Sequence, residues 1–201
     1  MTQEDSSVND MMCLMAGCII EIARSINKEH ISTFIQAILD AKRIYVTGAG
    51  RSGLVAKAFA MRLMHTGFPT YVVGETITPA ITEGDLMIVF SGSGNTKTIS
   101  DIAEMTKNFG GKVALISSDE NSSIGKIADF MIKIENQRYP IAKNPHKYEI
   151  HQMPNLYRSF APLGTIFETS SLIFSDAIIS TLMNIKKIDE SELKRHHTNI
   201  E

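Results

Sequence analysis

Hydrophobic and polar positions divide the chain into two kinds of segment that follow one another regularly. Short runs that are apolar almost throughout occupy residues 43–47, 70–73, 86–90, 112–116 and 130–134. Hydrophobic residues recur at helical spacing over 11–26, 31–39, 52–65, 96–109, 122–128 and 164–185. Apolar strands that alternate with helices are typical of a parallel sheet covered on both faces. The pattern therefore predicts an α/β fold, a three-layer sandwich with a five-stranded parallel sheet flanked by helices.

The remaining segments predict connections and a tail. Residues 74–85 are long enough for a turn or a short helix, whereas 139–157 contain three prolines and no clear period, which indicates a loop or lid. The apolar surface of 164–185 is wide enough to suggest burial against a partner subunit. We expect one domain, with N-terminal helices at 1–42, an α/β core at 43–135, a loop or lid at 136–160 and a C-terminal helix and tail at 161–201.

Composition narrows the classes of partner. The chain has 43% hydrophobic and 21% charged residues and a formal net charge of −2, which gives no sign of nucleic-acid binding. The apolar run at 11–22 is too short to span a membrane and follows an acidic start, unlike a signal peptide. Cys13 and Cys18 do not lie on one helical face, and no Cys/His pair has zinc spacing. We expect a cytoplasmic protein that binds no membrane, nucleic acid or metal.

A sequence of small hydroxyl residues and glycines, SGSGNT at 91–96, follows the apolar run at 86–90 directly. Gly92 lets backbone N–H groups approach an anion, and Ser91, Ser93 and Thr96 add hydroxyl donors at the start of a helix. A simple turn with a helix cap is the alternative, but a cap needs only one such residue. The lysine of a nucleotide P-loop is absent. The stretch therefore predicts a site for a phosphorylated small molecule.

A second glycine motif, GAGRSG at 48–53, matches the dinucleotide-binding fingerprint between a strand and a helix. Glu75 stands at the position of the acid that contacts a ribose, so a nicotinamide-dependent oxidoreductase is an alternative that NAD(H) binding would test. A second cradle at 91–96 has no role in such a site, whereas two loops can share one sugar phosphate. Arg51 and Ser52 place a charge and a hydroxyl inside the first loop.

Five motifs occur in order: GAGRSG at 48–53, GETITP at 74–79, SGSGNT at 91–96, PLGTIFE at 162–168 and HTNIE at 197–201. Together they resemble the sugar isomerase (SIS) domain family, and specifically its 6-phospho-3-hexuloisomerase branch. The resemblance implies a homotetramer with sites shared between subunits and no metal or organic cofactor. It also implies interconversion of D-arabino-3-hexulose 6-phosphate and fructose 6-phosphate.

That reaction moves a ketone along the sugar through an enediol, and one carboxylate can carry out both carbon proton transfers. The resemblance implies that Glu168 is this base and that His197, reaching a neighbouring subunit, moves protons between oxygens or opens the sugar ring. Without it, Glu168 would be a solvated helix-start acid and His197 a terminal histidine. The other implied site residues are Ser52, Ser91, Ser93 and Thr96 for the phosphate, and Gly50, Arg51, Glu75 and Gly92 for the rest of the substrate.

Arg51 is expected to pair with the phosphate or to stabilise the enediolate oxygens. Glu75 is expected either to bind sugar hydroxyls or to be a surface acid at the end of a strand. Two features depart from the family pattern: Arg195 is shifted by one place because His196 precedes His197, and the proline-rich segment at 139–157 is long. Another phosphosugar isomerase, acting on arabinose 5-phosphate or sedoheptulose 7-phosphate, is an alternative. A non-catalytic sugar-phosphate sensor on the same fold is another.

Overall fold

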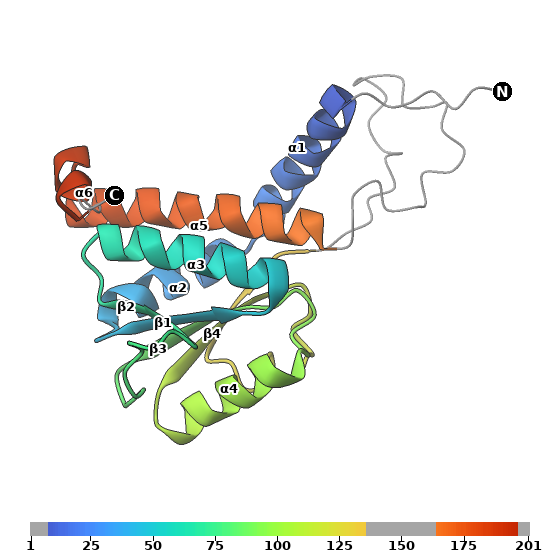
Figure 1. Cartoon of the computed structure of the whole chain (residues 1–201). Coiled ribbons are helices and arrows are strands. Elements are labelled where there is room, and N and C mark those ends of the chain that lie inside the picture. The colour runs from blue at the N-terminus through green and yellow to red at the C-terminus, as the bar shows by residue number, and fades with distance from the viewer. Residues whose placement is uncertain (1–7, 136–163, 197–201) are drawn as a thin grey trace.

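A computed structural model of the chain describes residues 8–135 and 164–196 (Figure 1). The lid expected at 139–157 and the tail that carries His197 lie outside the described residues.

The strands form one parallel sheet, as the sequence predicts. They are β1 (Ile44–Gly48), β2 (Thr70–Val72), β3 (Leu86–Phe90), β4 (Lys112–Ser117) and β5 (Phe130–Lys133). Their order is β2-β1-β3-β4-β5. Strand β2 lies beside β1 in one direction, whereas β3, β4 and β5 follow in the other. The strand order therefore reverses between β1 and β3. Gly48 and Phe90 are register partners there. Loops after two such strands diverge and open a crevice, the usual ligand site of open α/β sheets.

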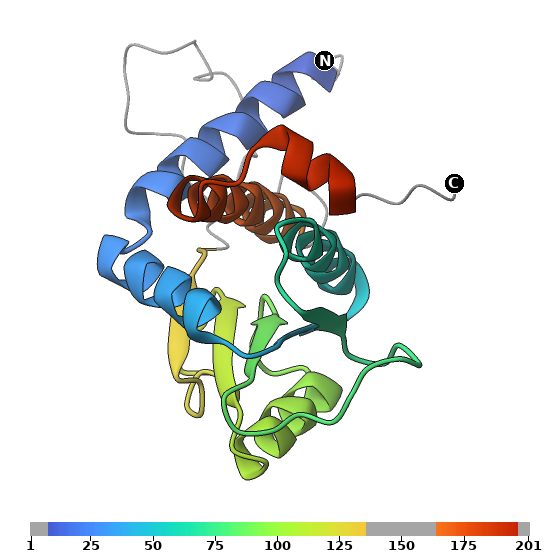
Figure 2. The same ribbon diagram turned by 90° about the vertical axis from the view of Figure 1, so that its left-hand side faces the viewer.

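Helices cover both faces of the sheet unequally. They are α1 (Val8–Ser25), α2 (Lys28–Asp40), α3 (Gly50–His65), α4 (Lys97–Asn108), α5 (Thr165–Lys186) and α6 (Glu190–His196). Helices α2 and α3 lie on one face with α5 behind them, and α1 packs on α5 and projects beyond the body (Figures 1 and 2). Helix α4 lies on the opposite face (Figure 2). The arrangement confirms the predicted layers.

Side chains alternate between two cores because each strand is covered on both sides. In β1, Ile44 and Val46 join the core beneath α2 and α3, whereas Tyr45 joins the core beneath α4. All of β3 is buried. This two-sided burial explains why the strands are apolar at consecutive positions.

Two connections between strands consist of turns and contain no helix. The sequence pattern predicts a short helix at 122–128, but this segment consists of turns, so the prediction is wrong. Ile124 is fully buried and its N–H donates to Gly94 O at 3.1 Å, outside the segment. At Gly125 a Cβ would lie only 2.3 Å from Glu120 O, so the chain is folded back on itself too tightly for a regular helix. Residues 74–85 also form turns, one of the two expected forms.

Within the described ranges, α5 is the one helix long and apolar enough to cross a membrane by composition. Half of its most apolar window is buried inside the fold, which is typical of a core helix. Phe174 of α5 packs against Phe34 of α2, with ring centroids 6.0 Å apart.

Candidate active site

The 48–53 loop connects β1 to α3 so closely that two of its glycines have no room for a side chain. A Cβ on Gly53 would lie 2.6 Å from Gly48 O, and a Cβ on Gly48 would lie 2.9 Å from Phe90 O. The helix therefore begins directly against the ends of β1 and β3. Gly50, with φ 56°, is the first residue of α3 and is exposed, and Ser52 beside it is half-buried. Close packing thus accounts for the first and third glycines of the motif.

The 91–96 loop connects β3 to α4 in a compact turn. Ser91 is buried, and Gly94 N donates to both its carbonyl and its Oγ at 3.1 Å. Ser93 is exposed and its Oγ accepts from Asn95 N at 3.3 Å. Thr96 is the N-cap of α4 and half-buried, but its side chain makes no capping hydrogen bond. Within the turn, Ser91 therefore holds the backbone, while the hydroxyls of Ser93 and Thr96 remain at the surface.

The 117–125 loop supports the 91–96 loop from outside, a contact that sequence reasoning missed. Gly92 O accepts from Ser118 Oγ at 2.6 Å and from Ser117 Oγ at 3.2 Å. Asn95 Oδ1 accepts from Ser123 N at 2.8 Å and from Ser123 Oγ at 2.9 Å. These bonds turn carbonyl and amide oxygens towards the 117–125 loop. The oxygens that would repel an anion thus already accept hydrogen bonds from the protein. This suits a loop whose N–H groups bind an anion.

The N-termini of three helices come together at this edge of the sheet. Helix α3 follows β1 and α4 follows β3. Helix α5 joins them because Phe167 packs on Gly92, where a Cβ would lie 3.3 Å from Phe167 Cδ1. Ala49, Thr96 and Gly164 are the respective N-caps, and none of their side chains caps its helix in the described structure. By contrast, Asn27 caps α2 with bonds to Glu29 N and His30 N. Uncapped helix N-termini carry free N–H donors and partial positive charge.

Glu168 lies in the first turn of α5 and is largely buried, with 12% of its side chain exposed. Arg51 Nε of α3 donates to Glu168 Oε2 at 2.6 Å. The structure thus joins two site residues that lie 117 positions apart in the sequence. Arg51 was expected to meet the phosphate or the enediolate, and in the structure its partner is the candidate base.

Glu75 stands beyond the end of β2 and pairs with Lys57 Nζ of α3 at 2.8 Å, both side chains being about half exposed. Sequence reasoning did not select Lys57. The pairing places Glu75 beside α3, on the β2 side. His197 lies outside the described residues, and no group of three or more potential metal ligands occurs among the residues that are described.

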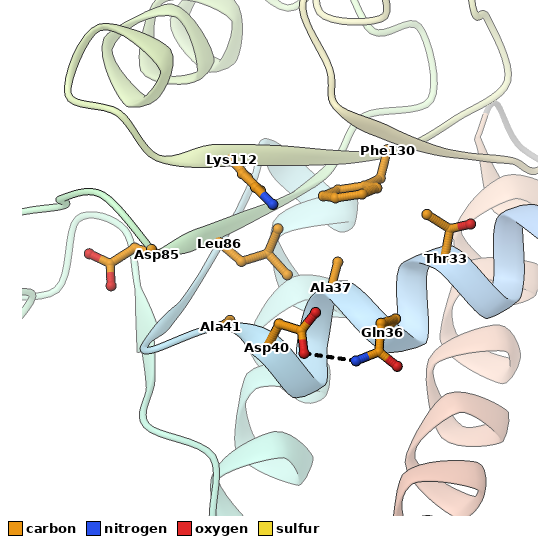
Figure 3. A pocket seen from close by; sticks show the side chains of 10 residues that line it. Thr33, Gln36, Ala37, Asp40, Ala41, Asp85, Leu86, Lys112 and Phe130 are labelled. Carbon is orange, nitrogen blue, oxygen red and sulfur yellow. Dashed lines mark hydrogen bonds between the residues drawn. The ribbon is translucent and has the colours of Figure 1, made fainter.

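The opposite edge of the sheet contains a hollow of about 240 Å³ between α2 and the starts of β3, β4 and β5. Gln36, Asp40, Lys112 and Phe130 line it (Figure 3). It lies at the amino ends of the strands, whereas ligands of parallel sheets bind at the carboxyl ends. We therefore assign the candidate site to the loops after β1 and β3.

Asp85, directly before β3, is buried and forms an ion pair with the partly exposed Arg43 on that same far edge. Arg43 Nη2 donates to Asp85 Oδ2 at 2.7 Å, and Thr82 N donates to the same oxygen at 2.8 Å. Burial favours the neutral carboxyl, but the hydrogen bonds from Arg43 and Thr82 outweigh it, so the pKa of Asp85 lies below its ordinary value. The pair fixes the strand starts and takes no part in the candidate site.

The SIS domain family model matches residues 37–145, which include both glycine loops. The chain belongs to the SIS domain family. A Bacillus subtilis (strain 168) protein named 3-hexulose-6-phosphate isomerase is 41% identical over 179 residues, covering 89% of this chain and 91% of that protein. The family membership confirms the resemblance on which the sequence interpretation rests.

Solved structures support the same assignment. The crystal structure of a Methanococcus jannaschii protein, for which a 3-hexulose-6-phosphate isomerase function was inferred, has a TM-score of 0.80 at 31% identity and covers 96% of this chain and 99% of that one. The Vibrio vulnificus NanR protein complexed with ManNAc-6P has a TM-score of 0.70 at 17% identity, covering 94% of this chain and 67% of that one, and shows the fold alone.

Proposed function

We propose that this SIS domain chain is a 6-phospho-3-hexuloisomerase, which interconverts D-arabino-3-hexulose 6-phosphate and fructose 6-phosphate. The observation that carries the proposal is the meeting of three uncapped helix N-termini with one largely buried carboxylate at the edge where the strand order reverses. The N-termini suit a phosphate dianion, and the carboxylate suits proton transfer at carbon. The relative named 3-hexulose-6-phosphate isomerase gives the substrate class.

The phosphate is proposed to bind at the 48–53 and 91–96 loops. Ser52, Ser91, Ser93 and Thr96 hold it there, with Gly50 and Gly92 allowing close approach of the backbone. Of these, the buried Ser91 also shapes the turn, because its Oγ accepts from Gly94 N while its O–H remains a donor for the phosphate. Binding the phosphate fixes the distance between the sugar carbons and Glu168, which converts the proton transfers into steps within one complex.

In the proposed reaction Glu168 removes the proton from C2 of the 3-hexulose while O3 gains a proton, which gives the C2–C3 enediol. Glu168 then returns a proton to C3 while O2 loses its proton, which leaves the ketone at C2. One proton moves between the two carbons and one between the two oxygens, so no oxidant or reductant is needed. We propose that His197 performs the transfer between oxygens, and that Glu75 binds sugar hydroxyls.

Proton NMR of fructose 6-phosphate in D₂O tests this proposal. The wild-type protein should replace the hydrogen at C3 with deuterium and produce the 3-hexulose. Glu168→Gln should lower the exchange rate by about 10³-fold, as expected for loss of a general base. Glu104→Gln is the matched control, because Glu104 is an exposed acid on α4 and the same substitution removes the same charge there.

The position of exchange separates the competing functions. Exchange at C1 without exchange at C3 would indicate an aldose–ketose isomerase instead. Binding of the sugar phosphate with no exchange at any carbon would favour a sensor. Equal exchange rates for wild type and Glu168→Gln would exclude Glu168 as the base.

We also propose a cytoplasmic homotetramer with sites shared between subunits. Exposed apolar side chains on two neighbouring helices support this assembly: Val8, Met12 and Ile20 on α1, and Leu172, Ile173 and Ile185 on α5. Monomers rarely leave such side chains uncovered over adjacent helices. Free Cys13 and Cys18 agree with a reducing compartment. Light scattering of the purified protein measures the subunit number directly.

A further inference from the structure

The two oxygens of the Glu168 carboxylate have different neighbours. Arg51 donates to Oε2, whereas Oε1 lies close to Gly164. Arg51 Nε donates to Oε2 at 2.6 Å, which makes this a short charge-assisted hydrogen bond. The Arg51 side chain is 61% exposed and that of Glu168 is 12% exposed, so a largely buried carboxylate is held by a residue at the rim. A carboxylate oxygen that already accepts a short bond from a cation is the weaker base of the two.

Gly164 sets the position of the second oxygen. It has φ 85° and is the N-cap of α5, and Glu168 N donates to its carbonyl at 3.0 Å. A Cβ at Gly164 would lie 3.1 Å from Glu168 Oε1 and 3.3 Å from Oε2. The carboxylate therefore folds back over the start of its own helix, into space that is free because residue 164 has no side chain.

We propose that Arg51 and Gly164 are positioning residues that fix the Glu168 carboxylate so that Oε1 exchanges the proton with the substrate carbons. The inference rests on the proposed role of Glu168 as the base. One base serves two adjacent carbons only if its oxygen stays within bonding reach of both, and a displacement of about 1 Å can cost about 100-fold in rate. Arg51, from α3, and Gly164, from α5, restrict the carboxylate from two elements that pack against each other.

Arg51→Gln and Arg51→Lys test the first half of the proposal. Arg51→Gln should lower kcat about 100-fold with KM nearly unchanged, because the substrate still binds while the base is misplaced. Arg51→Lys retains the charge and should recover part of kcat. Adding Arg51→Gln to Glu168→Gln should cost nothing further, because Arg51 acts through Glu168. Arg62→Gln, the same change at an exposed arginine near the other end of α3, is the control.

Two results would overturn this half. A rise in KM at constant kcat would show that Arg51 binds the substrate, and a full additional loss in the Glu168→Gln background would show that it acts on the reacting oxygens. Absence of C3 exchange in the wild-type protein would overturn the proposed function as well. If the wild-type protein is active but the losses from Arg51→Gln and Glu168→Gln simply add, the positioning role alone is refuted.

Gly164→Asn tests the second half. Asparagine tolerates a positive φ better than most residues, so the change adds a Cβ against the carboxylate with less backbone strain. We expect a kcat loss of about 100-fold at nearly constant KM. Gly67→Asn is the control, since Gly67 has φ 80° and its nearest atom to an added Cβ is Lys186 Nζ at 3.9 Å. Retention of full kcat by a folded Gly164→Asn would refute the role of Gly164. If that variant fails to fold, Gly164→Ala, which adds the Cβ alone, is measured in its place and judged by the same result.

Discussion

Asn95 ties the 91–96 loop to the 117–125 loop, and replacing it tests whether the first loop is built to bind an anion. Its Oδ1 accepts from Ser123 N and Ser123 Oγ, and its Nδ2 donates to Ser93 O at 2.9 Å. Asn95→Ala removes all three bonds. Because Asn95, Ser93 and Ser123 are exposed, water replaces part of each bond, and we assign about 0.5 kcal/mol to each, about 1.5 kcal/mol together. This loss should lower the Tm by about 3–6 °C.

Asn95→Asp separates the support of the loop from its charge. An aspartate retains the acceptor for Ser123 but loses the donor to Ser93 O and places a negative charge in the loop. Its Tm should therefore fall less than that of Asn95→Ala, while its affinity for fructose 6-phosphate should fall more. A tenfold loss of affinity corresponds to about 1.4 kcal/mol, and we expect at least this for Asn95→Asp.

Isothermal titration with fructose 6-phosphate, together with thermal unfolding with and without ligand, measures both quantities on the same samples. Unchanged ligand affinity in Asn95→Asp would refute the anion-binding role of the 91–96 loop. An unchanged Tm and affinity in Asn95→Ala would show that the bonds to Ser123 do not hold the loop.

Three further predictions concern the scaffold. Because the pKa of Asp85 is below its ordinary value of about 3.9, its stabilising pair with Arg43 is fully present above that pH and is lost as the pH falls through the lowered value. Asp85→Asn should therefore cost about 2 kcal/mol at pH 7 in urea unfolding and progressively less below about pH 4; a gap independent of pH would contradict this. Gly53→Ala forces a Cβ against Gly48 O and should abolish C3 exchange or folding, and a fully active variant would refute the close approach. Gly17→Ala, in open space on α1, should raise stability by about 0.5 kcal/mol, and a measured loss would mean that this helix face is covered in solution.

Most of the fold could be predicted from the sequence because each strand is buried on both faces. The run at 86–90 corresponds residue for residue to β3, and every strand lies within a residue or so of its predicted run. The helix predicted at 122–128 is absent for a physical reason. Ile124 is buried by contact with residues distant in sequence, and seven residues are too few to form a stable helix where the chain reverses tightly at Gly125.

The candidate site could be predicted only where its signal is local. Glycines and hydroxyl residues directly after a strand mark the 48–53 and 91–96 loops. The pairing of Arg51 with Glu168 joins residues 117 positions apart, and no spacing rule reaches that far. The hydrogen bonds from Ser117 and Ser118 to Gly92 O were missed for a second reason, because serine after a strand is also an ordinary turn residue.

In the proposed site, phosphate binding and proton transfer come from different parts of the chain. Both glycine loops belong to the continuous stretch of strands from β1 to β5, whereas the carboxylate arrives on α5, after the sheet is complete. In the proposed site, the two loops that bind the phosphate and the carboxylate that moves the proton therefore come from separate parts of the chain, which meet where Phe167 packs on Gly92. In a SIS domain with the proposed site, a substitution of the carboxylate in the first turn of α5 removes the proton transfer and leaves the two glycine loops in place.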